Sequence, residues 1–161
     1  MSMFLKDTFQ SMKEEFKKLV FEGLRKAKSR NLDIYTFALY HDHESHVATV
    51  CIDTMESSNR SVLSSNDFAK KNFTKAIEAC DLVGAGLWNA NGGRSFALGN
   101  FALVNASEID VPRKPEIPGF YLDMVLSIEE MKDLILMQSS HGRNLLFCCS
   151  TEESEVGLIW S

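Results

Sequence analysis

The chain has 161 residues, of which 45% are apolar and 24% are charged, and its formal net charge is −5. This length and composition are typical of one folded domain and exclude an intrinsically disordered chain. The acidic balance argues against nucleic acid as a partner, because phosphate binding needs a basic surface. An acidic surface is suited to a basic protein partner instead.

The N-terminal region has the pattern of an amphipathic helix, because apolar residues recur every three or four positions between Leu5 and Ala27. No signal peptide is evident, and no segment approaches the roughly 20 consecutive apolar residues that span a bilayer. The four cysteines show no Cys-x-x-Cys spacing, and the adjacent Cys148 and Cys149 would point to opposite faces of a strand. We therefore expect buried, reduced thiols and a cytoplasmic protein that has no membrane partner.

Two stretches near the ends of the chain have the pattern of β-hairpins. In the first, the apolar runs 34–40 and 47–52 flank a polar segment with three histidines and two acidic residues. In the second, the runs 145–149 and 156–160 flank a segment that contains three glutamates. Short apolar runs separated by a few polar residues predict pairs of antiparallel strands.

The middle of the chain is predicted as follows. We expect a serine-rich loop over 59–66, a helix over 69–80, and a glycine-rich loop over 84–93 whose Leu87 and Trp88 anchor it in the core. A third strand over 96–104 would precede an irregular segment containing Pro112, Pro115 and Pro118. A last helix is expected over 120–138, although Ser127 and Glu130 fit a capping box that would start it at Ser127. Together these elements predict a single α+β domain over residues 1–161, with a mainly antiparallel sheet of about five strands packed by three helices.

Motifs for catalysis or cofactor binding are absent from the sequence. Gly84-Ala85-Gly86 resembles the beginning of a dinucleotide loop, but Asn89 occupies the position of the third glycine and a helix is predicted before it. No Gly-x-Ser-x-Gly elbow occurs, and Cys80 lies on the apolar stripe of its predicted helix, as a buried structural thiol would. We therefore expect no catalytic residues and no cofactor.

His41, His43 and His46 form a cluster with metal-ligand chemistry. Alternation along a strand would place His41 and His43 on one side, and imidazole nitrogen binds zinc or nickel. The tip of a hairpin, however, lacks the rigid surroundings that orient metal ligands. A solvated turn without a metal is therefore the favoured interpretation, and a metal site is the weaker alternative.

The two polar turns are also acidic. Asp42 and Glu44 lie in the first turn, and Glu152, Glu153 and Glu155 lie in the second. One interpretation is that these residues are charged only because turns face water. The other is that they form an acidic rim for a basic partner, where complementary charge mainly raises the association rate.

Residues 33–40 (DIYTFALY), preceded by the amphipathic helix, and residues 146–160 (LFCCSTEESEVGLIW) together resemble the bacterial family known as domain of unknown function 4303. The resemblance follows the order of elements over most of the chain, and its motifs are short apolar patterns. It implies an immunity protein that binds and blocks a cognate toxin. The family brings no established catalytic residues.

These observations together predict a bacterial immunity protein that neutralises a cognate secreted toxin by occluding its active site. Its partner would be the toxin, with a basic active-site cleft, and the expected contact residues are Asp42, Glu44, Glu152, Glu153, Glu155 and Trp88. Two alternatives remain open at this point. One is a small-molecule-binding regulatory module with the Trp88 loop lining its pocket, and the other is an enzyme of unrecognised type.

Overall fold

A computed structural model describes residues 3–111 and 119–161, with side chains from residue 12 onward. The helices are α1 (Met3–Ser29), α2 (Met55–Glu78), the short α3 (Leu82–Ala85) and α4 (Phe120–Leu136). The strands are β1 (Thr36–Asp42), β2 (Val47–Asp53), β3 (Glu108–Asp110), β4 (Leu146–Cys149) and β5 (Leu158–Trp160). Two 3-10 turns, η1 (Leu98–Asn100) and η2 (Gly142–Asn144), complete the described elements. The three predicted loop prolines lie outside the described residues.

The strands form one sheet in the order β3-β2-β1-β4-β5. Both predicted hairpins are confirmed, because β1 pairs antiparallel with β2 and β4 pairs antiparallel with β5. The two hairpins join through β1 and β4, which run parallel with Thr36 opposite Leu146. The expected α+β domain, with five strands and three long helices, is therefore present, and its sheet is mixed.

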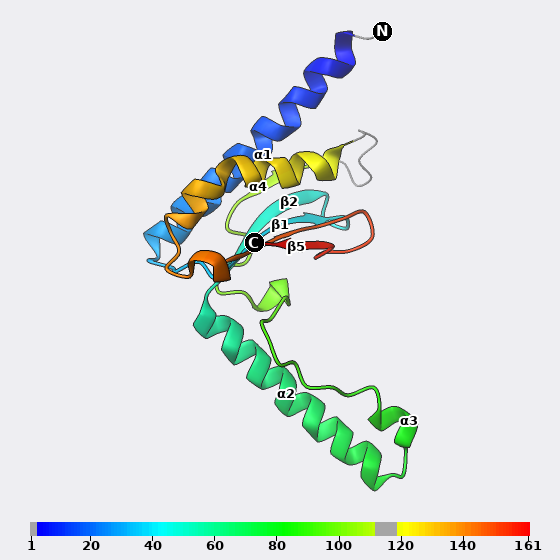
Figure 1. Cartoon of the computed structure of the whole chain (residues 1–161). Helices are drawn as coiled ribbons and strands as arrows, with labels where there is room; N and C mark the ends of the chain where they lie inside the picture. The colour runs from blue at the N-terminus through cyan, green and yellow to red at the C-terminus, as the bar shows by residue number, and fades with distance from the viewer. Residues whose placement is uncertain (1–2, 112–118) are drawn as a thin grey trace.

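One face of the sheet is covered by α1 and α4, which lie together above it in Figure 1. The apolar stripe of α1 is buried here from Phe16 to Ala27, and Phe16 meets Phe120 of α4 edge to face at 5.3 Å. Lys17 of α1 pairs with Glu130 of α4 at 3.1 Å on the rim of this contact. Burial of this face supplies the main core, whose largest fully buried side chains are Phe16, Leu19, Ile34, Phe37, Leu39, Ile52, Phe120, Met124, Ile128, Ile135, Leu145 and Phe147.

The opposite face of the sheet carries a smaller core. Leu98 and Phe101, at η1, cover Ala38, Cys51 and Cys148. Cys148 therefore lies on this face whereas Cys149 belongs to the main core, which confirms that the adjacent thiols point in opposite directions. Burial raises the pKa of both thiols to about 12, so that they are protonated and unreactive at neutral pH.

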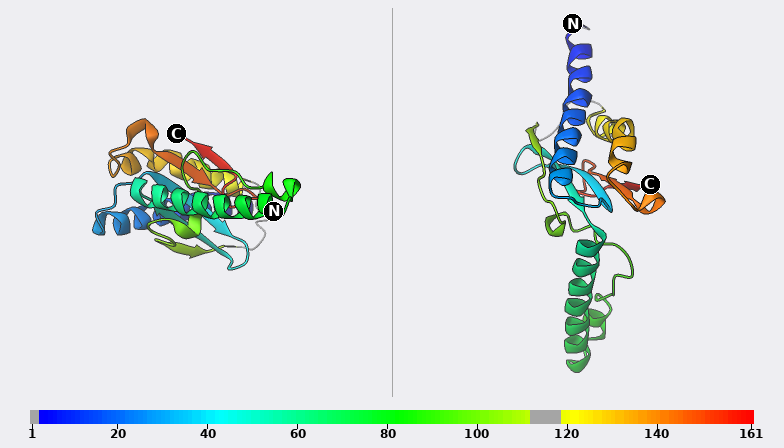
Figure 2. Two further views of the ribbon diagram at one scale, coloured as in Figure 1. Left: turned by 90° about the horizontal axis from the view of Figure 1, so that it is seen from below. Right: turned by 90° about the vertical axis from the view of Figure 1, so that its left-hand side faces the viewer.

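Helix α2 leaves the sheet at the end of β2 and projects away from it, as Figures 1 and 2 show. Thr54 caps its first turn, where the Thr54 hydroxyl accepts the N–H of Ser57 at 3.2 Å. The predicted loop over 59–66 is therefore wrong, because the helix has already begun at Met55 and continues through those serines. Within α2 the only buried residue is Ser58.

Three further expectations about the middle of the chain are corrected by the structure. Leu87 and Trp88 are exposed at the far end of α2 instead of lying in the core, and Trp88 packs on Phe68 at 5.5 Å. Cys80 is exposed with a positive φ of 56°, so it is no buried thiol. The run over 96–104 contains η1 and a single bridge to β2 in place of a strand.

The last helix begins at Phe120 and not at Ser127, because the hydroxyl of Ser127 donates to the Asp123 carbonyl within the helix at 2.6 Å. Ser127 is therefore an interior residue of α4 and does not cap its N-terminus. Among the described residues, none of the helices combines the length and the apolar character that crossing a membrane requires.

Candidate functional site: the acidic end of the sheet

The two acidic turns lie at the same end of the sheet. Strands β1 and β4 run parallel, so the turn after β1 and the turn after β4 both leave from this end. Figure 1 shows the two hairpin turns beside one another, below the first turns of α4. Segments about a hundred residues apart in the sequence are thus brought together by the pairing of β1 with β4.

Ser150 fixes the second turn to the first. Its hydroxyl accepts the N–H of His41 at 3.0 Å and donates to the Glu155 carbonyl at 2.8 Å, while its own N–H donates to the Leu39 carbonyl. Ser150 is buried, so these hydrogen bonds are shielded from water. At the far side of the turn, a Cβ on Gly157 would lie 2.2 Å from the Thr151 side chain, so the close return of the chain requires glycine.

The carboxylates of the two turns are held in different ways. Asp42 accepts the N–H groups of Ser45 and Glu44 at 3.1 and 2.9 Å, and these hydrogen bonds, that of Ser45 first, lower the pKa of its carboxyl. The Tyr40 hydroxyl donates to Glu155 at 3.3 Å. Burial, followed by the charges of Glu155 and Asp42, raises the pKa of Tyr40 to about 12. Hydrogen bonds therefore hold the side chains of both Asp42 and Glu155 in place.

A third segment adds charge to the same place. Asp110 of β3 lies opposite Val47, and the N–H of Val111 donates to the His46 carbonyl at 2.8 Å. We define the acidic end by six carboxylate residues: Asp42, Glu44, Asp110, Glu152, Glu153 and Glu155. Sequence reasoning missed Asp110, because a strand of three residues leaves no alternating pattern to detect.

Helix α4 borders the acidic end through its second residue, Tyr121. Burial raises the pKa of Tyr121, and the charge of Glu152 raises it further. Its hydroxyl lies 3.0 Å from Nδ1 of His41 and 3.5 Å from Nε2 of His43. The start of α4 and the turn after β4 therefore face one another across the end of the sheet.

The histidines behave as parts of this packing. His41 is fully buried, its ring centroid lies 4.2 Å from that of His43, and both belong to the helix-covered face, as alternation predicts. His46 is exposed in the turn and takes a positive φ of 58°. Within residues 3–111 and 119–161, no three side chains of histidine, cysteine or acidic type are grouped so as to hold a metal ion. Zinc titration would test the metal alternative directly.

Trp88 is the one predicted contact residue that the structure does not bring to the acidic end. It lies on the projecting part of the chain beyond α2, and α2 begins where β2 ends, at the opposite end of the sheet from the turns. The right-hand view of Figure 2 shows α2 and α3 projecting below the sheet. A surface that uses the acidic turns and Trp88 together is therefore not formed within one molecule.

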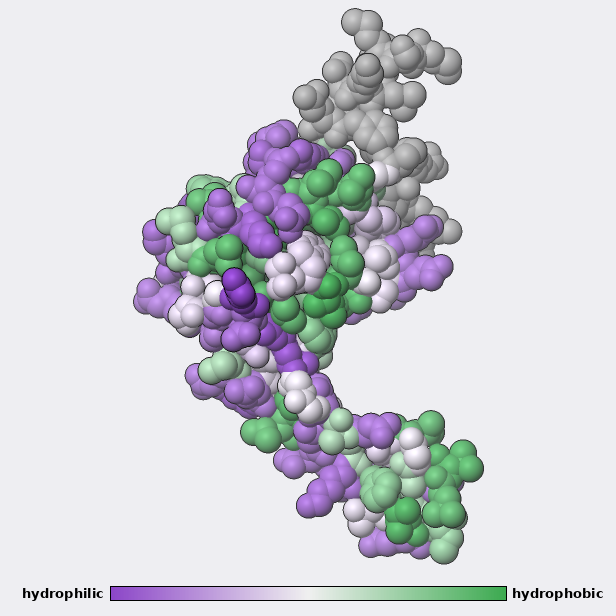
Figure 3. Space-filling view, in the orientation of Figure 1, coloured by the Kyte–Doolittle hydropathy of each residue, from purple (hydrophilic) through white to green (hydrophobic). Residues whose placement is uncertain are grey.

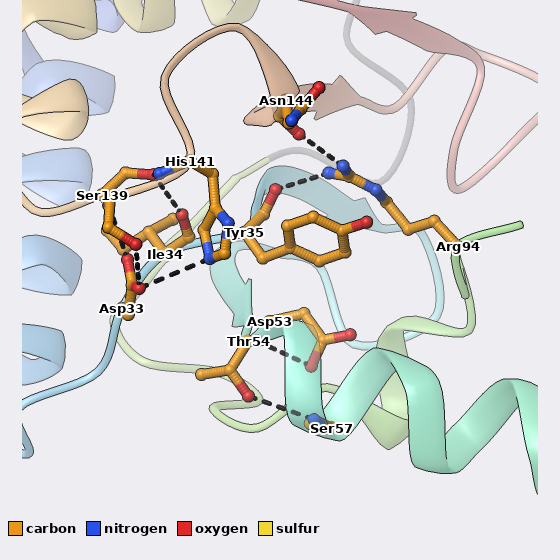
Figure 4. Close-up of polar contacts among 11 residues, drawn as sticks. Asp33, Ile34, Tyr35, Asp53, Thr54, Ser57, Arg94, Ser139, His141 and Asn144 are labelled. Atoms are coloured by element: carbon orange, nitrogen blue, oxygen red, sulfur yellow. Dashed lines mark hydrogen bonds and ion pairs between the residues drawn. The ribbon is translucent and has the colours of Figure 1, made fainter.

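The opposite end of the sheet carries a polar network centred on Arg94 (Figure 4). The Arg94 guanidinium donates to the Tyr35 carbonyl at 2.5 Å, to the Thr36 hydroxyl at 3.1 Å and to the Asn144 carbonyl, and it lies 3.5 Å from the centroid of the Tyr35 ring. Beside it, Asp33 accepts from Ser140 and faces His141 at 3.4 Å. The guanidinium of Arg94 donates to oxygen atoms of Tyr35, Thr36 and Asn144, so this network attaches the segment after α3 to the sheet.

An open hollow of about 890 Å³ lies between the first half of α2 and the returning segment. Its lining is mostly hydroxyl, amide and guanidinium groups, and Trp88 is not part of it: the residues are Ser57, Arg60, Ser61, Val62, Ser64, Ser65, Phe68, Asn91, Arg94, Ser95, Phe96, Ala97 and Asn100. The small-molecule alternative expects the loop that carries Trp88 to line a pocket. One residue of that loop, Asn91, lines this hollow, and Trp88 itself does not.

The chain was compared with protein-family models, with curated proteins and with solved structures, and none of the three comparisons gave a match.

Proposed function

We propose that this protein is an immunity protein that binds a cognate secreted toxin and blocks its active site, without chemistry of its own. The observation that carries the proposal is the joining of two acidic turns into one anionic end. Neither residues 41–47 nor residues 150–160 contain a lysine or an arginine, so no cation within the turns offsets their charge.

The charge of this end is suited to fast association with a basic surface. Carboxylates on neighbouring turns act together on an approaching cation, and their attraction is screened beyond a Debye length of roughly 8–10 Å at physiological salt. Complementary charge of this kind raises association rates by roughly 10- to 1,000-fold at low salt. Asp42 and Glu155 are already held in place by hydrogen bonds, so they lose less conformational freedom on binding than free side chains would.

Affinity in such an interface comes mainly from apolar anchors that become fully buried. Two exposed apolar side chains lie next to the acidic end: Leu122, in the first turn of α4, and Leu158, at the start of β5. We propose them as anchors that contact the rim of the toxin cleft while the carboxylates enter it. Substrate, which would be drawn to the same cationic groups, is then excluded.

The proposal is tested by expressing the chain together with the protein encoded beside it and measuring growth and co-purification. The native chain is expected to restore growth and to co-purify. Lysine at Glu152, Glu153 and Glu155 is expected to abolish both. A chain that neither restores growth nor co-purifies with the neighbouring protein contradicts the proposal.

A matched control separates local charge from net charge. A variant with Glu22→Lys, Glu56→Lys and Asp133→Lys has the same change in net charge. These residues are exposed and lie away from the turns: Glu22 is in the last third of α1, Glu56 is in the first turn of α2 and Asp133 is in the last turn of α4. This variant is expected to protect as well as the native chain. Equal loss of protection in both variants would mean that overall charge, and not the acidic end, is responsible.

A further inference from the structure

The part of the chain that projects from the sheet exposes far more apolar surface than a solvated segment should. We call residues 55–97, which contain α2, α3 and the returning segment, the arm. Leu82, Val83 and Leu87 are 74%, 84% and 77% exposed at its tip. Figure 3 shows hydrophobic residues gathered there, at the lower right. With those along α2, and apart from Met55 at its base, the exposed large apolar side chains of the arm are Leu63, Phe68, Phe73, Ile77, Leu82, Val83, Leu87 and Trp88.

The exposed apolar area of the arm can be compared with that of known interfaces. An aromatic side chain presents roughly 150–250 Å² and an aliphatic one somewhat less, so these exposed fractions amount to roughly 1,000 Å². The largest apolar patch on a monomeric protein is about 300–600 Å². A stable protein interface buries about 800 Å² on each partner. Summed over the arm, this apolar area is about that of one side of an interface, although Phe68 and Trp88 lie toward the returning segment and not on the same side of α2 as Phe73 and Ile77.

Helix α2 also lacks the internal support that would keep it folded in isolation. Eight of its 24 residues are serine or asparagine, which compete with the helical backbone for hydrogen bonds. Most helical stability in proteins comes from packing of an apolar face. Phe73 and Ile77, which belong to the predicted stripe, remain nearly half exposed because the returning segment covers a different side of the helix. The apolar stripe of α2 is therefore present, but no other part of the described chain packs fully against it.

The net charge of the arm indicates which kind of molecule covers its apolar surface. Residues 55–97 contain five basic and four acidic side chains, a net charge of +1, whereas the rest of the chain has a net charge of −6. A basic toxin is attracted to the acidic end and gains nothing electrostatically from the arm. A second copy of the arm is apolar, equal in area and carries a net charge of only +1, so it meets little electrostatic repulsion. We propose that two copies of this chain associate through their arms to form a symmetric dimer.

In a symmetric dimer the same patch is used on both copies, so each copy covers the other's α2 stripe and tip. Helix α2 starts at the end of the sheet opposite the turns, so we expect both acidic ends to stay exposed in the dimer. The assembly would then present two toxin-binding ends. Dimerisation is independent of the function proposed above, and either can fail without the other.

Sedimentation velocity over a range of protein concentrations tests the proposal, with the purified full chain and four variants. Phe73→Lys places a charge in the α2 stripe, and Val83→Lys places one at the tip. Losing a central contact costs about 2 kcal/mol of binding free energy, so each variant is expected to raise the dimer dissociation constant at least thirtyfold. Met137→Lys is the matched control, because Met137 is 81% exposed after α4, outside the arm. The fourth variant, with Glu152→Lys, Glu153→Lys and Glu155→Lys, is expected to dimerise as the native chain does.

Amide hydrogen exchange provides a second measurement that does not depend on folding of the variants. Exchange in residues 55–88 of the native chain is expected to slow as the concentration rises through the dimer range, while exchange in β1 and β2 stays constant. A native chain that remains monomeric at a concentration of about 1 mM overturns the proposal, since an interface of this size should bind more tightly. So does a dimer that Phe73→Lys and Val83→Lys leave unchanged.

Discussion

Asp53 provides a precise test of how the arm and the second core are attached to the sheet. It is fully buried at the end of β2, and its Oδ1 accepts the N–H groups of Thr54 and Ala102, both at 3.0 Å. Among the described residues no group is placed to donate a hydrogen bond to its Oδ2, and the nearby Ser57 hydroxyl donates to the Asn100 carbonyl at 3.3 Å. One carboxylate therefore holds the start of α2 and the segment after η1 together.

Replacing Asp53 with alanine leaves two partly buried N–H groups without an acceptor. Each such group costs about 1–3 kcal/mol, so Asp53→Ala should lower the free energy of unfolding by about 2–6 kcal/mol. Asp53→Asn keeps an oxygen for both N–H groups and removes the buried charge, so it should cost much less. Urea denaturation of the three proteins at pH 7 measures these differences. An alanine variant as stable as the native chain would refute this account of the attachment.

The pH dependence of the same variants gives an independent check. Burial raises the pKa of Asp53 above its ordinary value of 3.8. The folded protein then binds a proton before the unfolded chain does, so this carboxyl makes the native state less stable as the pH rises through its raised pKa. The stability of Asp53→Asn relative to the native chain should therefore increase with pH between 3.8 and that raised pKa. A constant difference between pH 4 and 7 would contradict the assignment.

Three further substitutions test the packing of the two ends of the sheet. Gly157→Ala places a Cβ 2.2 Å from the Thr151 side chain and should destabilise the fold by about 1–3 kcal/mol in urea denaturation, because the turn must open. Ser150→Ala leaves the His41 N–H without its acceptor and should cost about 1–3 kcal/mol, with faster amide exchange at His41 as its signature. Arg94→Lys cannot reproduce a guanidinium that reaches three protein oxygens, and should cost about 2 kcal/mol. Unchanged stability in any of the three would refute the corresponding contact.

The parts of the fold that follow a local pattern were predictable from the sequence. The hairpins were found because apolar runs flank polar turns, and α1 was found because its stripe has helical spacing. The parallel pairing of β1 with β4 has no local signal, since it joins segments about a hundred residues apart. That pairing is what brings the acidic turns together, so the turns were predictable one by one and their convergence was not.

The arm was predicted less well, for a physical reason. The serine-rich segment predicted a loop, and the large apolar side chains of Leu87 and Trp88 predicted burial in the core. Both predictions assume that a chain covers its own apolar groups. Here the helix begins at Met55 and the apolar groups face outward. The same departure is the observation from which we infer that the arm is an interface.

The association rate with the neighbouring protein, measured by stopped flow at increasing salt, tests the central claim most directly. If the acidic end enters a cationic cleft, the native chain should associate at least about tenfold faster at low salt than at high salt. Lysine at Glu152, Glu153 and Glu155 should remove that dependence, while lysine at Glu22, Glu56 and Asp133 should preserve it. A salt-independent rate for the native chain, or an equal effect of the two sets of substitutions, would contradict binding through the acidic end.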